Sequence, residues 1–358
     1  MTIQESTRSY EQWLRARMPL IAADLQLKHD RMSSGAFAFL RATFYRWVQL
    51  WQRGCPELAS APLVLGVGDL HVENFGTWRD SEGRLIWGVN DFDEACWLPY
   101  PNDLVRLCAS AQLAATENDT GCGLNQICEA VLEGYTTGLK EGGRSFVLAE
   151  SHRWLRTLAT GELREPARFW MKLTDLKTLK SSVPRGVKLA LAQALPELGT
   201  SFRIVHRQAG LGSLGRRRFV GLADWRGGLV AREAKELAPS AWNWQQRRDD
   251  PDLLYQQIIS RAVRVPDPCL RLHGNWLIRR LAPDCSRIEL ASLPKVKDEL
   301  KLLQAMGWET ANIHLGTKSA VAPILKDLER RPKNWLIKAV SAMAKVTTSE
   351  WSHWRDGY

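Results

Sequence analysis

Two short apolar runs, Leu63–Val67 and Leu85–Val89, each lead into a cluster of polar and acidic residues. The length and composition of both runs are typical of buried strands, and the turn residues Arg79–Gly83 between them indicate a hairpin. Asp69 follows the first run, and Asp91 follows the second. We therefore expect two neighbouring strands whose ends bring these two acids together with Asn74 at one rim.

Helical periodicity dominates most of the first 200 residues. It predicts helices over residues 8–30, 36–52, 103–115, 124–140, 143–160 and 187–197. Beyond residue 200 the pattern changes to short strands, which we expect at 201–207, 216–222, 228–233 and 275–281. Further helices are predicted over 251–263, 296–314 and 320–346. The chain is therefore predicted to fold as an α+β protein.

The polar residues that follow the first two strands carry candidate chemistry. Carboxylate and amide oxygens are the ligands that a hard divalent cation prefers, and one remaining carboxylate is free to act on a hydroxyl. Asp69-Leu70 with Asn74 five residues after the Asp fits the Asp-Leu-x-x-x-Asn pattern of kinase catalytic loops. The segment also resembles the Gly-Asp-x-His-x-x-Asn and Asp-x-x-x-Ala patterns of aminoglycoside and choline phosphotransferases, the latter at Asp91–Ala95.

This resemblance implies a role for each matching residue. Asp69 is expected to position the acceptor hydroxyl and to take its proton, while Asn74 and Asp91 are expected to coordinate Mg²⁺. For Asp93 two roles stay open, which are binding a second metal ion and holding the loop. His71 is expected to brace the loop through hydrogen bonds rather than to bind metal.

A glycine-rich turn lies between two of the later strands and contains Gly210, Gly212, Ser213 and Gly215. Lys235 follows on a later strand. In kinases such a turn covers the phosphates of ATP, and the lysine pairs with the α and β oxygens. The helix expected at 251–263 contains no Glu to orient that lysine. The candidate replacements are Asp249, Asp250, Asp252 and Glu236.

Several segments together resemble an uncharacterised bacterial family, the domain of unknown function twenty-two fifty-two. The resembling segments are 28–41, 68–76, 90–95, 103–107 with Ser110, 210–215 and 235–240. The family is grouped with protein-kinase-like folds, so the resemblance implies a two-lobed fold that binds ATP and Mg²⁺.

The order of the motifs differs from that of an ordinary kinase, because the acidic loop precedes the glycine-rich turn. We therefore expect a circularly permuted kinase-like fold. Its parts are a helical leader (1–60), a mainly helical catalytic lobe (61–200), a small β-rich nucleotide-binding lobe (201–290) and a helical return to the large lobe (291–358).

Charge and cysteine content narrow the expected partners. The net charge of +10 favours anionic partners such as nucleotide phosphates, but the basic residues are spread along the chain, so nucleic-acid binding is not expected as the main role. Seven cysteines without a Cys-x-x-Cys pair indicate reduced thiols. No signal peptide and no apolar stretch of the ~20 residues needed to cross a bilayer is visible, so we expect a soluble, cytoplasmic protein.

The favoured function is an ATP- and Mg²⁺-dependent phosphotransferase acting on a hydroxyl of a small molecule or protein, with nucleotidyl transfer as a variant. Two alternatives come from other classes. One is a metal-dependent hydrolase that uses Asp69, His71, Glu73, Asp91 and Asp93. The other is a catalytically silent nucleotide-binding or interaction protein, since the orienting Glu is missing.

Overall fold

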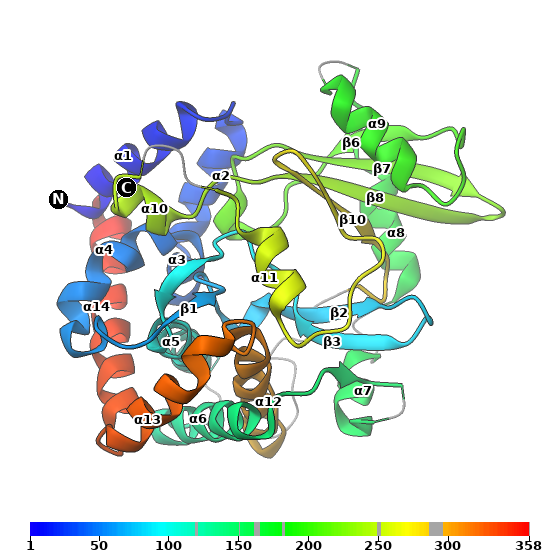
Figure 1. Ribbon diagram of the computed structural model, residues 1–358. Helices are drawn as coiled ribbons and strands as arrows, with labels where there is room; N and C mark the ends of the chain where they lie inside the picture. Colours follow the sequence, from blue (N-terminus) through cyan, green and yellow to red (C-terminus); the bar gives the residue numbers. More distant parts are fainter. Residues whose placement is uncertain are drawn as a thin grey trace.

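The protein has an α+β fold, which confirms the predicted class. The computed structural model describes residues 1–118, 121–149, 151–160, 165–180, 183–248, 252–285 and 296–357. Figure 1 shows most of the helices gathered on one side of the molecule and an antiparallel sheet on the other. In this described part of the chain, no helix is both long and apolar enough to pass through a lipid bilayer.

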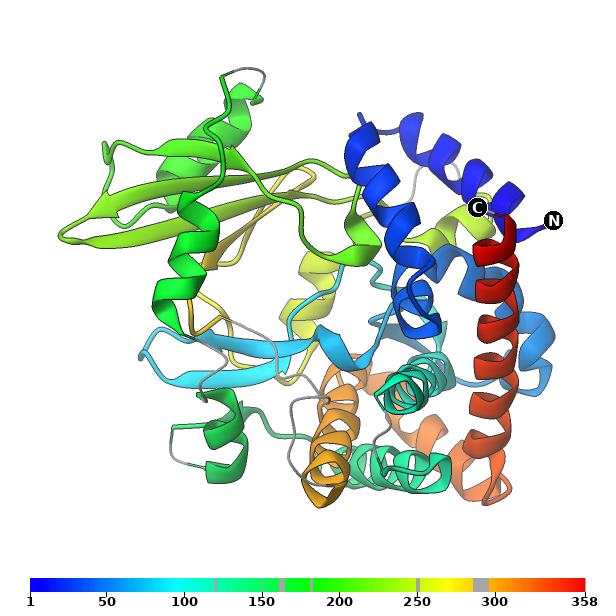
Figure 2. The same cartoon turned by 180° about the vertical axis from the view of Figure 1, so that it is seen from behind.

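The helical side is built around one continuous apolar core. Its helices are α1 (Ile3–Arg15), α2 (Ala22–Met32), α3 (Ala36–Ala42), α4 (Phe44–Gly54), α5 (Pro101–Glu117), α6 (Leu124–Glu141), α10 (Ala241–Gln245), α12 (Val296–His314), α13 (Val321–Arg330) and α14 (Trp335–Gly357). Helix α5 is buried along almost its whole length, including its polar residues Asp103, Arg106 and Ser110. The two termini lie side by side, as Figure 2 shows, where the side-chain amide of Gln4 donates to the carbonyl of His353 at 2.9 Å.

The other side of the molecule contains a five-stranded antiparallel sheet with the strand order β6-β7-β8-β10-β9. The strands are β6 (Arg203–His206), β7 (Arg218–Trp225), β8 (Gly228–Glu236), β9 (Arg271–His273) and β10 (Trp276–Leu281). Helix α11 (Tyr255–Arg261) lies in the connection from β8 to β9. At the β7–β8 turn Arg226 and Gly227 both have positive φ, 51° and 83°, as a type I′ hairpin turn requires.

The two faces of this sheet differ because side chains alternate along each strand. On one face Phe219, Ala234 and Ile278 pack against α9 (Arg185–Ala194). The opposite face is apolar only at one end, where Leu222, Ala231 and Leu281 pack against α8 (Pro166–Thr174). The rest of that face carries charged residues and points toward the helical side of the molecule.

The predicted pairing of Leu63–Val67 with Leu85–Val89 is wrong. Strand β1 (Leu63–Gly66) pairs with β4 (Cys96–Pro99), whereas β3 (Leu85–Val89) pairs with β2 (Phe75–Arg79) and with β5 (Phe146–Val147). The acidic stretch 68–74 folds back in a short turn. The residues directly before the predicted hairpin turn therefore become the partner of β3.

Several predicted helices also differ from the observed ones. The helix expected over 8–30 is two helices, because the chain turns at residues 16–21 around Pro19. The helix expected over 36–52 is interrupted at Thr43, which joins α3 to α4. Instead of a helix over 143–160, the chain forms β5 and the short helix α7 (Arg153–Ala159). The proposed lobe boundaries stay predictions, and the one between 290 and 291 lies outside the described residues.

Helices α6 and α12 pack closely against each other, and a substitution at their contact tests this packing. A Cβ atom added at Gly134 of α6 would lie 1.9 Å from the carbonyl oxygen of Gln304 in α12. Because that neighbour is backbone, we expect Gly134→Ala to lower the free energy of unfolding by about 1–3 kcal/mol in urea titrations. Gly228→Ala is the control, since nothing lies within 4 Å of its added Cβ. Equal stability of both variants and the wild type would contradict this helix contact.

Candidate functional site

The acidic loop after β1 is held in place by one face of α5. Asp103 accepts hydrogen bonds from the backbone N–H groups of Val67 at 2.7 Å and Gly68 at 2.9 Å. Three and seven residues further along α5, Arg106 binds Asp69 and the hydroxyl of Ser110 accepts from the N–H of Val72. Residues with this spacing lie on one side of a helix, so a single rigid element positions the whole loop.

Gly68 allows the sharp turn at the start of the loop. Its φ is +79°, and an added Cβ would lie 2.4 Å from the carbonyl oxygen of Glu94. Both the conformation and the space therefore require glycine.

Asp69 lies in the cavity wall with its carboxylate bound to the buried guanidinium of Arg106, whose Nε donates to Oδ1 at 2.9 Å. Arg106 is itself fixed, because it donates to the carbonyl of Leu40 and lies over the rings of Phe44 and Trp47. Burial raises the pKa of Asp69 to about 7, and Arg106 opposes that rise. Such a carboxylate is suited to taking a proton near neutral pH.

The next polar residues are engaged with each other. Asn74 accepts a hydrogen bond from the N–H of His71 at 2.6 Å through its side-chain oxygen, and His71 Nδ1 accepts from the N–H of Glu73. Glu73 forms an ion pair with Arg41 at 2.6 Å. These contacts agree with the loop-bracing role predicted for His71.

Asp91 and Asp93 follow β3 and meet Lys235 of β8. The Lys235 ammonium lies 3.0 Å from Asp91 Oδ2 and 2.6 Å from Asp93 Oδ2. Burial raises the pKa of Asp91, but Lys235 outweighs it and holds that pKa well below its usual value. Burial, together with the neighbouring charge of Asp91, raises the pKa of Asp93 to about 6.

Asp91 and Asp93 are the carboxylates that pair with Lys235 in the described part of the chain. Glu236, one predicted replacement, pairs with Arg217 instead. Asp249 and Asp250, two others, lie outside the described residues.

Two of the three consecutive arginines at the start of β7, Arg216 and Arg218, are buried. Arg216 donates to Glu94 at 3.2 Å and forms an ion pair with Asp93 at 3.7 Å. Arg218 donates to the hydroxyl of Ser213 at 2.8 Å.

The glycine-rich segment packs against the N-terminal helices. Gly212 forms part of the short 3₁₀ turn η4 (Leu211–Ser213), and its added Cβ would lie 3.0 Å from the carbonyl oxygen of Arg41 and 3.4 Å from Asp69. Gly215 has a φ of +95° and contacts Leu25 of α2. The buried ammonium of Lys28 donates to the carbonyl of Gly212 at 3.2 Å. These contacts explain two of the glycines by close packing.

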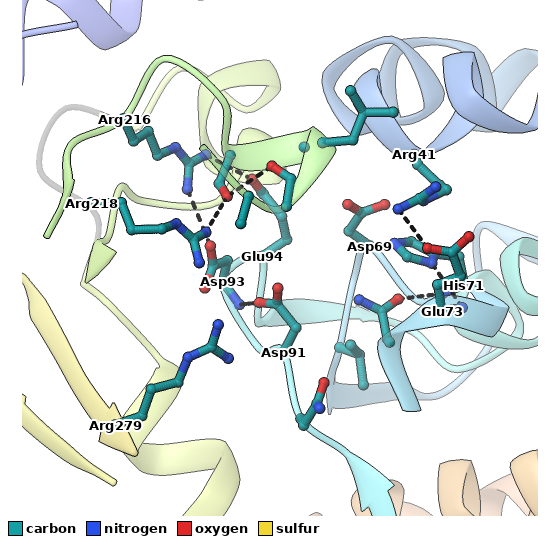
Figure 3. Close-up of a pocket in the computed structure, with 18 of the residues that line it drawn as sticks. Arg41, Asp69, His71, Glu73, Asp91, Asp93, Glu94, Arg216, Arg218 and Arg279 are labelled. Carbon is teal, nitrogen blue, oxygen red and sulfur yellow. Dashed lines mark hydrogen bonds and ion pairs between the residues drawn. The ribbon is translucent and has the colours of Figure 1, made fainter. Parts of the chain in front are cut away.

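These elements enclose one cavity of about 620 Å³. Its lining contains most of the predicted site residues, namely Asp69, Asn74, Asp91, Asp93, Gly210, Gly212 and Ser213. Lys235 reaches the cavity through its contacts with the two aspartates, and Gly215 packs on α2 away from the lining. The walls carry nine basic and six acidic side chains, so the cavity favours an anionic ligand. Figure 3 shows Asp69 on one side, with Arg216, Arg218 and Arg279 on the other side of Asp91.

Sequence reasoning missed a cluster on the charged face of the sheet. Glu233 has no exposed surface and accepts from Arg207 at 2.7 Å, Arg218 at 3.0 Å and Arg279 at 2.7 Å. The sequence signal for this cluster was a Glu within β8, a strand whose other side chains are mostly buried. Its arginine partners come from three strands or their ends, so no spacing along the chain joins them.

Few acidic side chains of the cavity are placed to bind a metal ion. Among the described residues, no three His, Cys, Asp or Glu side chains converge into a group that could hold a metal ion. Asp91 and Asp93 remain as a pair, and Oδ1 of Asp93 is buried without a hydrogen-bond partner.

Residues 20–179 match the family model described as an uncharacterized protein conserved in bacteria, DUF2252, which confirms the resemblance predicted from the sequence. The matched segment contains the acidic loop, Asp91, Asp93 and α5. It ends before the five-stranded sheet, so the segments 210–215 and 235–240 lie outside the match. Searches of curated proteins and of solved structures found no match to this chain.

The Glu233 cluster yields a stability prediction. Burial raises the pKa of Glu233, but its three arginines outweigh burial and hold the pKa well below its usual value, so the group is ionised at pH 7. Glu233→Gln leaves buried guanidinium groups without their counter-charge. We expect a loss of about 3–5 kcal/mol in the free energy of unfolding, measured by urea titration at pH 7.

The matched control is Glu197→Gln, because Glu197 forms an exposed pair with Arg226 at 3.6 Å. It should change stability by less than about 1 kcal/mol. A Glu233→Gln protein as stable as the control would show that the cluster does not depend on this carboxylate.

Proposed function

We propose that the protein is a kinase-like phosphotransferase that uses ATP and Mg²⁺ to phosphorylate a hydroxyl group of a small molecule or protein. The observation that carries the proposal is the contact of Lys235 with Asp91, 144 residues away in sequence, beside Asp69 in the same cavity. A phosphate-binding lysine, metal-binding acids and an acceptor base must meet across one site for this chemistry.

The arrangement of the sheet supports a kinase-like small lobe. The glycine-rich segment connects the first strand, β6, to the second, β7, and Lys235 lies on the third, β8. Two helices, α10 and α11, lie between β8 and β9, and kinases place the lysine-orienting helix in the corresponding connection. The adjacent termini make a permuted order of the two lobes physically accessible.

The acids beside Lys235 fit Mg²⁺ in number and chemistry. Asp91 is one-third exposed to the cavity, and Asp93 has a buried oxygen without a hydrogen-bond partner. Asn74 has one lone pair left on the oxygen that accepts from His71. When bound, Mg²⁺ neutralises charge on the transferred phosphoryl group.

The protein's own residues then supply position and proton transfer. Arg106 fixes the orientation of Asp69, which accepts a hydrogen bond from the acceptor hydroxyl. Asp69 takes that proton as the hydroxyl oxygen bonds to the γ-phosphorus and the bond from this phosphorus to the bridging oxygen breaks, so that ADP leaves. Lys235 and the basic cavity wall attract the phosphates. Placement and electrostatics of this kind account for most of the catalysis of phosphoryl transfer. Nucleotidyl transfer is a variant that uses the same groups.

The hydrolase alternative is less well supported, because His71 and Glu73 are engaged with their own loop and with Arg41. The alternative of a catalytically silent nucleotide-binding protein differs from the favoured function only in that it does not turn over ATP. ATP binding without phosphorylation of any acceptor, and without slow ATP hydrolysis, would favour it.

Substitutions of the two aspartates separate binding from transfer. We expect Asp69→Asn to bind MgATP like the wild type, with about 2.7 kcal/mol of stabilisation at 100 times Kd in thermal unfolding, but to lose phosphoryl transfer. Asp91→Ala should lose the Mg²⁺-dependent part of turnover.

The control for both substitutions is Asp224→Asn on the exposed end of β7, which should behave as the wild type. Undiminished turnover by Asp69→Asn would remove this residue from the mechanism.

The raised pKa of Asp69 predicts a pH dependence. The carboxylate must be deprotonated to accept the hydroxyl proton, so kcat/KM should increase about tenfold per pH unit below pH 7 and level off above it. Initial rates between pH 5 and 9 measure this profile. A flat profile across this range would argue against Asp69 as the base.

A further inference from the structure

The charged face of the sheet holds three arginines in a fixed arrangement. Register places Arg218 opposite Lys235 and Glu233 opposite Arg279, so these side chains share one face. The neighbouring strand β6 is followed by Arg207, whose guanidinium reaches the same Glu233.

The cluster carries more positive than negative charge. Glu233 supplies one carboxylate to three guanidinium groups, and the acids nearby are already engaged, since Asp91 and Asp93 hold Lys235 while Glu94 holds Arg216. Arg207 and Arg279 keep 28% and 22% of their side chains exposed, and both line the cavity. Excess cationic charge at such a partly desolvated site is stabilised by an anionic ligand.

The fixed geometry favours phosphate groups in particular. Guanidinium groups bind phosphate through two parallel N–H donors, and here Glu233 holds each one in place before a ligand arrives. Preorganised donors lose little side-chain entropy on binding.

The glycine-rich segment is less available for the same task. Gly212 and Gly215 are packed against α2, α3 and Asp69, and Lys28 holds the carbonyl of Gly212. Arg218 binds the hydroxyl of Ser213, which ties the segment to the sheet.

We propose that the phosphate chain of the nucleotide binds along Arg207, Arg218 and Arg279 on the sheet face. The glycine-rich segment then forms the cavity wall beside Asp69 and does not cover the phosphates. This assignment rests on the proposed function for the identity of the nucleotide. The binding of a phosphate chain itself does not depend on it.

The test uses inorganic tripolyphosphate and the full-length protein in EDTA, so that no metal ion and no transfer reaction are involved. Isothermal titration should show binding to the wild type, and Kd should rise at least tenfold in Arg279→Gln and in Arg207→Gln. Arg279→Lys keeps the charge but loses the paired donors, and its Kd should also rise.

The control is Arg271→Gln, which removes the same charge from an exposed position on β9 of the same sheet. It should leave Kd unchanged, and thermal unfolding without ligand checks that each variant is folded. Arg207 is the more exposed arginine, so its variant gives the readout if Arg279→Gln does not fold.

Absence of tripolyphosphate binding by the wild type, or equal Kd values for the wild type and both folded cavity variants, would overturn the assignment. If either of these results were accompanied by MgATP-dependent transfer, the proposed function would stand, but the phosphates would have to bind at another place in the cavity. Tripolyphosphate binding that the arginine substitutions weaken, without transfer to any acceptor, would keep the anion site and remove the phosphotransferase.

Discussion

The ion pair of Lys235 with Asp91 and Asp93 joins the sheet to the helical side of the molecule at the base of the cavity. A lysine that is 98% buried is stable only when its charge is compensated nearby, and both compensating carboxylates come from the turn after β3. The Arg216–Glu94 pair repeats this arrangement one residue further along the acidic turn. The cavity between the two sides is therefore lined by charges that hold the structure together and remain within reach of a ligand.

Helix α5 and the N-terminal helices position the opposite wall. Asp103, Arg106 and Ser110 fix the loop that carries Asp69. Asp103 is fixed in turn by a hydrogen bond between its Oδ2 and Nε2 of His314 in α12, at 3.1 Å. Helix α2 holds the glycine-rich segment through Lys28, and its Asp24 accepts from the side chains of His206 and Gln208. This wall is thus held by buried and partly buried hydrogen bonds, whose groups are costly to leave unpaired, so the contacts define one arrangement.

Local sequence patterns predicted the parts of the site that lie within single segments. The spacing of Asp69, Asn74 and Asp91 was sufficient to place these residues around one cavity, and the strands that carry the glycine-rich turn and Lys235 were expected. The pairing of β1 with β4 was missed because the acidic stretch folds back within a few residues, and apolar pattern alone does not specify a partner. The Glu233 cluster and Lys28 were missed because their partners meet only through sheet register and helix docking. The pairing of Asp69 with Arg106 was accessible, since both the acid and the arginine belong to motifs that the sequence singled out.

A crystal structure of the protein with a non-hydrolysable ATP analogue and Mg²⁺ would show directly where the nucleotide binds. We expect the phosphate chain to lie in the 620 Å³ cavity, between the charged face of the sheet and Asp91, with the terminal phosphate facing Asp69. A nucleotide bound outside this cavity, or a cavity that stays filled only by solvent at saturating analogue, would contradict this expectation.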